Sequence, residues 1–385
     1  MKKLRLLFVF FITLSIFFSF NILFASAGKK GEEEKKVTAP REDTVTDVIE
    51  EGTMAEEKGE EEWWKAPSGG SILVSELPEP DKNAGPFTIA FVCNDVKDAF
   101  NIDVWNGFKE AAKEYPKLDL HMFDSKNNPE DSIKAVMDVQ ALNPDLAIYF
   151  NWVAAGDVLA AWCEENQTPL IEIDAPWGEN AWFFGLDNKL AGQLGGEAIA
   201  EWVNRNWKGE DIWIINATEY ESGEVVYYRN SEFLKRFLEL KDDSIEVQNL
   251  HDNGKVDELN APVDAELGMQ LFTDWLTAHP QADHFVVWGT TDTTVSGMYS
   301  AAVNQNRVDQ GVFGSINGTT YATDIMKVDD SYLGTITMFP EFYGRNVLKT
   351  AYCILTGIDV PKIVITTTIF MTMDELCDYY PERCD

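Results

Sequence analysis

The sequence predicts an α/β protein of two lobes, each built on a parallel sheet that helices cover on both faces. From residue 87 onward, apolar runs typical of buried strands alternate with runs of helical periodicity. Residues 118–151 contain a complete β-α-β unit, whose connection is long enough to require parallel strands. The alternation falls into two series, 87–206 and 211–316, which predicts two similar lobes with a cleft between them.

Capping residues locate the helix of this β-α-β unit. Asn128 occupies the N-cap position, Pro129 the first helical position, and Asp131 the position from which a capping-box acid reaches back. An apolar run precedes these residues and another follows the helix. The segment therefore predicts a strand, a crossover helix and a second strand.

The same criteria place the other elements in order along the chain. The first series predicts strands at 87–93, 118–123, 146–150 and 169–174, and helices at 102–115, 157–166 and 188–206. The second predicts strands at 211–217, 245–250, 284–288 and 311–316, and helices at 231–240, 264–278 and 295–304.

The first 27 residues have the features of a secretory signal peptide. Basic residues are followed by the apolar run 6–24 and by Ala25-Ser26-Ala27, which fits a cleavage site. An uncleaved anchor is the alternative, because the run is just long enough to span a bilayer. We expect cleavage and export to the periplasm or another extracytoplasmic space, with membrane anchoring as the alternative.

Residues 28–84 have the composition of a disordered tether. Acidic residues outnumber basic ones, aliphatic residues are few, and Gly and Pro recur. We therefore expect the folded part to begin near Gly85.

Charge and motifs argue against several function classes. The chain has 65 acidic and 31 basic residues and a net charge of −34, which argues against a nucleic-acid partner. The four histidines are dispersed, and no G-x-S-x-G, H-E-x-x-H, P-loop or G-x-G-x-x-G motif stands in a suitable place. We expect no enzymatic activity, no cofactor and no metal site.

The five cysteines divide into a pair and three single residues. Cys377 and Cys384 are the only closely spaced pair, and an exported chain should join them in a disulfide. A zinc site is the weaker alternative, because no histidine lies in this part of the chain. Cys93, Cys163 and Cys353 lie in apolar patterns, so we expect buried thiols.

Candidate binding residues stand at the expected carboxyl ends of strands, where open parallel sheets bind ligands. They are Phe100, Asn101, Asn151, Trp152 and Asp174 to Trp177 in the first lobe, and Arg229, Thr290 to Asp292 and Asn317 to Thr319 in the second. Sugars match this mixture, because their C–H faces stack on rings and their hydroxyls bond to polar groups. The alternatives are that Asp174 only caps the next turn and that Trp177 is a surface aromatic.

Five motifs carry a resemblance to a known family. They are FDSKNNPEDSIKAVMDVQAL, PLIEID, FGLDNKLAGQLGGEAIAEW, LTAHPQADHFVVWGTTDTTVSGMYSA and FGSINGT. Residues 85–385 resemble the type I periplasmic binding proteins of ABC sugar importers, in the ribose- and galactose-binding group. The resemblance implies two Rossmann-like lobes with three hinge crossings. Residues 85–187 and 339–367 would form the N-terminal lobe, and 188–338 and 368–385 the C-terminal lobe.

The resemblance also implies roles for individual residues. By position, Asp174 matches an acid that holds sugar hydroxyls, Arg229 an arginine of the second lobe, and Asp98 and Phe100 the amide and stacking ring of the first loop. Asn317 stands where ribose binders usually have aspartate. Ala175, Thr291 and Met338 replace a common arginine, asparagine and glutamine, so plain ribose or galactose is not expected. Trp152, Trp177 and Trp288 would fill the space.

The function expected from the sequence is that of an exported, non-catalytic receptor for a carbohydrate or related polyol. It would deliver this ligand to an ABC permease in the cytoplasmic membrane. The rivals are a chemosensory or signalling receptor that contacts a membrane sensor, an enzyme on a similar fold, and an anchored structural protein.

Overall fold

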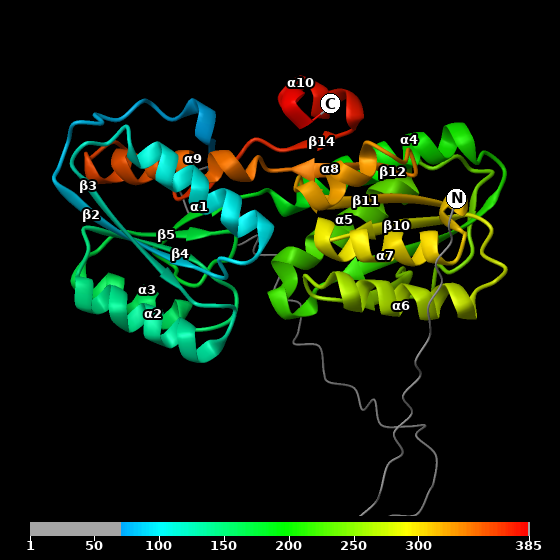
Figure 1. Ribbon diagram of the computed structural model, residues 1–385, viewed down its shortest axis with the longest axis horizontal. Coiled ribbons are helices and arrows are strands. Elements are labelled where there is room, and N and C mark those ends of the chain that lie inside the picture. The colour runs from blue at the N-terminus through cyan, green and yellow to red at the C-terminus, as the bar shows by residue number, and fades with distance from the viewer. Residues whose placement is uncertain (1–70, 384–385) are drawn as a thin grey trace, which may run out of the picture. The chain divides into compact units, whose positions relative to one another are not determined.

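The computed structural model describes residues 71–383 (Figure 1). The expected signal peptide, most of the expected tether and Cys384 lie outside the described residues. The described chain forms two sheets with helices on both faces of each, which confirms the predicted fold class.

The first sheet and its helices form the N-terminal lobe. Its strands are β1 (Ser71–Leu73), β2 (Phe87–Cys93), β3 (Leu118–Asp124), β4 (Leu146–Phe150), β5 (Leu170–Ile173), β6 (Trp182–Gly185) and β13 (Ile363–Ile365). They lie in the order β1-β13-β6-β5-β4-β2-β3, and all pairs are parallel. Helices α2 (Pro129–Leu142) and α3 (Gly156–Asn166) cover one face, and α1 (Ala99–Ala112) and α9 (Pro340–Leu355) the other.

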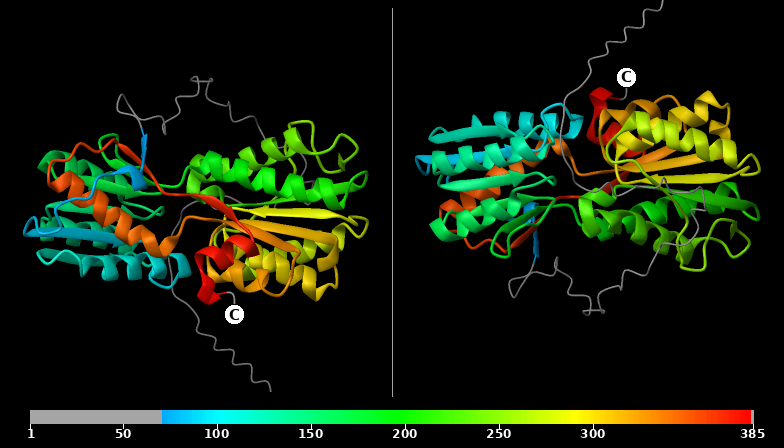
Figure 2. Two further views of the ribbon diagram at one scale, coloured as in Figure 1. Left: turned by 90° about the horizontal axis from the view of Figure 1, so that it is seen from above. Right: turned by 90° about the horizontal axis from the view of Figure 1, so that it is seen from below.

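The second sheet and its helices form the C-terminal lobe. Its strands are β7 (Asp211–Thr218), β8 (Glu246–Val247), β9 (Asp257–Asn260), β10 (Phe285–Gly289), β11 (Gly311–Asn317), β12 (Tyr332–Thr337) and β14 (Ile369–Met371). The order is β14-β12-β11-β10-β7-β8, with β9 beside β7, and only β14 is antiparallel. Figure 2 shows α4 (Asn188–Asn206) and α5 (Gly223–Leu240) on one face and α6 (Ala265–Ala278) and α7 (Asp292–Asn304) on the other.

Shorter elements complete the lobes. They are α8 (Thr320–Met326), α10 (Met373–Tyr379) and the 3-10 turns Val74–Glu76, Tyr220–Ser222, Val308–Gln310 and Pro381–Arg383. The chain passes between the sheets three times: after β6, after β12 and after β13. These three passages agree with the crossings that the resemblance implied.

The two helices on one face of the N-terminal sheet touch through their backbones. A Cβ atom added at Gly344 in α9 would lie 2.0 Å from the backbone nitrogen of Phe108, and one at Gly107 in α1 would lie 2.3 Å from the Glu341 carbonyl oxygen. Real Cβ atoms are not found at such distances. Glycine at both positions is therefore what lets α1 and α9 pack this closely.

The expectation that the tether extends to residue 84 was wrong. Ser71–Leu73 pair in parallel with Ile363–Ile365 at the edge of the N-terminal sheet. Val74 and Leu77 are each only 3% exposed. Ile72, Val74 and Leu77 pack against the core of the lobe, although the surrounding composition is polar.

Two elements of the C-terminal lobe also differ from prediction. Helix α5 begins at Gly223, well before residue 231, and the strand expected at 245–250 is reduced to Glu246–Val247. Apolar periodicity did not predict the early part of α5, because Arg229 and Asn230 lie on its buried face. Polar residues on a buried helix face often mark a functional site.

Candidate functional site

A cavity of about 680 Å³ is lined by residues from both lobes at the carboxyl ends of their strands. Nine of the predicted site residues line it: Asp98, Phe100, Asn101, Trp152, Asp174, Arg229, Thr291, Asn317 and Met338. Its size is in the usual range for small-molecule pockets. The cavity is therefore the candidate site.

Asp174 follows β5 and is held by bonds to two other parts of the chain. Its carboxylate accepts the backbone N–H of Leu186 at 3.1 Å and the hydroxyl of Tyr343 at 3.3 Å. Gly185 gives the carboxylate room, because a Cβ there would lie 2.2 Å from Asp174 Oδ1. Burial raises the pKa of Asp174 to about 6, against the lowering effect of the Arg229 charge.

Arg229 is buried in α5 with its guanidinium fixed by two hydrogen bonds. Nε donates to Asn188 Oδ1 at 2.7 Å, and Nη1 donates to the carbonyl oxygen of Thr290 at 3.0 Å. Burial lowers the pKa of Arg229, while the charges of Asp174 and Glu219 raise it. The guanidinium thus lies in the field of two carboxylates that share its cavity wall.

Aromatic rings form a wall on the side of the N-terminal lobe. The ring of Phe100 lies 6.1 Å from that of Phe150 and 5.4 Å from that of Tyr343. The indole of Trp152 meets Phe150 edge-on at 4.9 Å. Phe100 and Trp152 both line the cavity, so they offer apolar faces to a ligand.

The loop beside these rings holds polar atoms without partners. Asp98 caps α1 by accepting the backbone N–H of Asn101 at 3.1 Å, and burial raises the pKa of Asp98. Asn94 Oδ1, Asn101 Oδ1 and Trp152 Nε1 are buried and have no hydrogen-bond partner within residues 71–383. Unpaired buried polar atoms are costly, so these three are available to a bound molecule.

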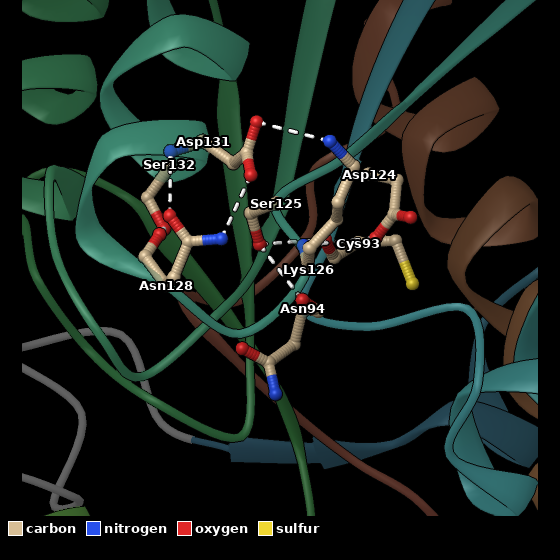
Figure 3. Close-up of polar contacts among 8 residues, drawn as sticks. All are labelled: Cys93, Asn94, Asp124, Ser125, Lys126, Asn128, Asp131 and Ser132. Atoms are coloured by element: carbon tan, nitrogen blue, oxygen red, sulfur yellow. Dashed lines mark hydrogen bonds and ion pairs between the residues drawn. The ribbon is translucent and has the colours of Figure 1, made fainter. Parts of the chain in front are cut away.

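Neighbouring loops set the position of Asn94 (Figure 3). The buried hydroxyl of Ser125, just after β3, donates to the carbonyl oxygens of Cys93 at 2.8 Å and Asn94 at 2.9 Å. Asn128 caps α2 as predicted, because its Oδ1 accepts the backbone N–H of Asp131 at 2.9 Å. The carboxylate of Asp131 bonds to the side chain of Asn128 and not to its backbone.

Several predicted residues lie outside the cavity lining. They are Asn151, Ala175, Pro176, Trp177, Thr290, Asp292, Gly318 and Thr319 among the candidate binding residues, and Trp288, which was expected to fill space. Trp177 packs on the α3 side of the N-terminal sheet, and its Nε1 donates to the carbonyl oxygen of Asn151 at 3.0 Å. Asp292 is fully buried and accepts bonds from Ser315, Thr319 and Thr335, which join α7 to β11 and β12.

Trp288 is the last of these residues. Its ring is fully buried and stacks on Phe233 at 4.6 Å, and its Nε1 donates to the carbonyl oxygen of Arg229 at 2.9 Å. Trp288 therefore supports Arg229 from within the lobe.

Other cavity residues were missed by sequence reasoning. Asn94 and Asp95 directly follow β2, Glu219 directly follows β7, and Tyr321 lies in the short helix after β11. All stand near the carboxyl end of a strand, so the rule that found Asp174 was sufficient to find them.

Glu172 explains why Trp177 turns away from the cavity. This buried carboxylate accepts the backbone N–H of Trp177 at 2.8 Å and that of Gly178 at 3.0 Å. Burial raises the pKa of Glu172 to about 7. Its two bonds fold the loop after β5 back over α3.

The raised pKa of Glu172 predicts a pH-dependent stability. The folded state holds the proton of Glu172 more tightly than the unfolded state does. The contribution of Glu172 to the free energy of unfolding is therefore complete below about pH 4.5 and is lost as the pH rises towards 7. For Glu172 alone the loss is about 3 kcal/mol. The melting temperature should fall between pH 5 and 8, and Glu172→Gln should flatten that fall. Glu165→Gln, which removes an exposed charge of α3, should not; equal slopes in both variants would contradict this account.

The cysteines agree with the sequence analysis as far as they are described. Cys93, Cys163 and Cys353 are free and buried. Cys377 is disulfide-bonded. Cys384 lies outside the described residues, so its pairing with Cys377 stays a prediction.

A model of the periplasmic binding protein domain family matches residues 89–359, which is well over half of the chain. The chain belongs to this family. Its members are binding proteins, so the chain is a solute receptor and not an enzyme. A search of curated proteins found no match. Within residues 71–383, no group of three His, Cys, Asp or Glu side chains could hold a metal ion.

Solved structures of solute-binding proteins share this fold. One from Bacillus halodurans, with bound myo-inositol, has a TM-score of 0.65 at 20% identity and covers 78% of this chain and 99% of that one. One from Actinobacillus succinogenes, with bound D-allose, has a TM-score of 0.64 at 18% identity, over 76% and 99%. The arabinose-binding component from a Shewanella species has a TM-score of 0.65 at 17% identity, over 77% and 95%.

Proposed function

We propose that this periplasmic binding protein captures a carbohydrate or a related polyol in the cavity and delivers it to an ABC permease in the cytoplasmic membrane. The composition of the cavity wall carries the proposal. The rings of Phe100 and Trp152 share the cavity with the charged groups of Asp174 and Arg229. Sugars use both kinds of surface, because their C–H faces stack on rings while their hydroxyls donate to carboxylates and accept from guanidinium groups.

The ligands of the similar structures support the same class. Myo-inositol, D-allose and arabinofuranose are polyhydroxylated rings, and each is bound by a protein of this fold. The cavity of the present chain supplies the buried acceptors and donors that such rings require.

The charged groups are tied to the segments that cross between the lobes. Asp174 accepts a hydrogen bond from Leu186, which lies in the first crossing between β6 and α4. It accepts another from Tyr343, which lies in the first turn of α9, soon after the second crossing. Arg229 donates to Asn188, the first residue of α4. A ligand that bridges Asp174 and Arg229 would favour one arrangement of these crossings over others, and this differential affinity would drive closure of the lobes.

Export is part of the proposal. The basic and apolar start of the chain has the features of a cleaved signal peptide, and residues 28–70 would then connect it to the folded part. In the part of the chain that the structure describes, no helix has the length and apolar character needed to cross a membrane.

A ligand panel tests the proposal. Pentoses, hexoses, cyclitols and linear polyols should include at least one compound that raises the melting temperature by mass action and changes tryptophan fluorescence. In Trp152→Phe, the fluorescence change should shrink while the thermal shift persists, because the ring face is kept. A panel without any thermal response would contradict the sugar or polyol assignment.

A further inference from the structure

Asp98 lines the cavity as a largely buried carboxylate without a cation. Its side chain caps α1 and accepts the backbone N–H of Asn101 at 3.1 Å, so its partners are backbone groups of the helix start. Burial raises the pKa of Asp98, and the like charge of Asp95 raises it further. None of the ion pairs within residues 71–383 includes Asp98.

Two of the other three acids of the cavity lie near a cation. Asp174 and Glu219 both act on the buried guanidinium of Arg229. The whole wall carries four carboxylates (Asp95, Asp98, Asp174 and Glu219) and two basic groups (Lys97 and Arg229). Acidic groups therefore outnumber basic groups in the lining, and a ligand with a positive charge would compensate for this excess as it displaces water from the wall.

Hydrogen-bond acceptors line the cavity wall that contains Asp98, and such a wall favours a ligand group that donates several hydrogen bonds. Asn101 is 3% exposed. Its Oδ1 and the Oδ1 of Asn94 are both buried and have no hydrogen-bond partner within residues 71–383. Together with the Asp98 carboxylate, these two oxygens form a group of acceptors in the cavity wall, beside the buried Trp152 Nε1. An ammonium group offers three donors and no acceptor. The faces of Phe100 and Trp152 would also attract a cation.

We propose that the ligand is an amino sugar or an amino cyclitol, whose protonated amine pairs with Asp98 and donates to Asn101 Oδ1. This inference rests on the proposed function, because it assumes a ligand with a polyhydroxylated ring and adds a positively charged amine to that ring. The ring would stack on the aromatic wall, and its hydroxyls would reach the Asp174 and Arg229 groups.

Matched pairs of compounds test the inference by calorimetry. D-glucosamine, D-galactosamine and D-mannosamine are each compared with the parent hexose and with the N-acetyl derivative, which has the substituent but not the charge. At least one amine should bind about 10- to 100-fold more tightly than both of its neutral partners, the range expected of a hydrogen bond to a charged group.

Two variants separate the Asp98 charge from its other effects. Asp98→Asn keeps an oxygen that can cap α1 and removes the charge, so the preference for the amine should fall to about 1. Glu110→Gln removes an exposed charge from the same helix, outside the cavity, and should keep the preference. A neutral hexose that binds as tightly as its amine would overturn the inference and leave the proposed function intact. An absence of binding by all amines and all neutral sugars would overturn both, and loss of the preference in Glu110→Gln would overturn the role of Asp98.

Discussion

Replacing Arg229 with alanine should weaken ligand binding by about 1.5–3 kcal/mol, roughly 10- to 100-fold in affinity. The guanidinium lines the cavity, is fixed by Asn188 and Thr290, and is the cation that Asp174 and Glu219 share. Its removal takes a charge-assisted donor from the ligand and removes the cation whose charge acts on the buried carboxylate of Asp174. Calorimetry with the tightest compound of the panel measures the loss.

Arg236 provides a matched control on the same helix. It is a partly exposed arginine of α5 that pairs with Glu197 and Glu239 and does not line the cavity. Arg236→Ala should leave the affinity unchanged. Equal affinities of Arg229→Ala and the unaltered protein would remove Arg229 from the site, and equal losses in both variants would indicate a general charge effect.

Replacing Gly344 with alanine should destabilise the fold by about 3 kcal/mol. The new methyl group would meet the backbone of Phe108 at 2.0 Å, and a helix backbone cannot yield as a flexible side chain can. Because Tyr343, the next residue, bonds to Asp174 and packs on Phe100, separation of α1 from α9 should also weaken ligand binding. Chemical denaturation measures the first effect and calorimetry the second.

Asn346→Ala, on the same helix, is the control for this substitution. Asn346 is only partly buried, and its replacement should change the stability by less than about 0.5 kcal/mol. A stability of Gly344→Ala within that limit would contradict the close backbone contact of α1 and α9.

The elements that the sequence predicted best are those with the strongest local signals. The strand at 87–93 has a continuous apolar run, and the helix at 188–206 has an aspartate at its N-cap. The first two turns of α5 failed the same criteria because Arg229 and Asn230 face inward there. Strands β12 and β13 were not predicted from any pattern, and the family resemblance implied only that the chain crosses between the lobes near their ends.

The sequence predicted site residues correctly where the end of the preceding strand fixes the position of the residue. Asp174 directly follows β5, Thr291 lies two residues after β10, and both line the cavity. Trp177 was misplaced because the chain turns at Asp174, with a φ of 57°, and is then held by the distant carboxylate of Glu172. The prediction for Asp292 was wrong because this residue, the next after Thr291, begins α7, and its side chain bonds to Ser315 of β11 and Thr335 of β12 inside the lobe. Both outcomes depend on tertiary contacts that no local pattern contains.

The most direct test of the account is to identify what the protein holds when it is purified without added ligand. Mass spectrometry of the small molecules released on denaturation should find a polyhydroxylated ring compound in near-stoichiometric amount with the unaltered protein. The same compound should be strongly reduced with Arg229→Ala and retained with Arg236→Ala. A peptide, nucleotide or lipid in its place, or equal amounts of the sugar with Arg229→Ala, would contradict the assignment of the cavity as a carbohydrate site.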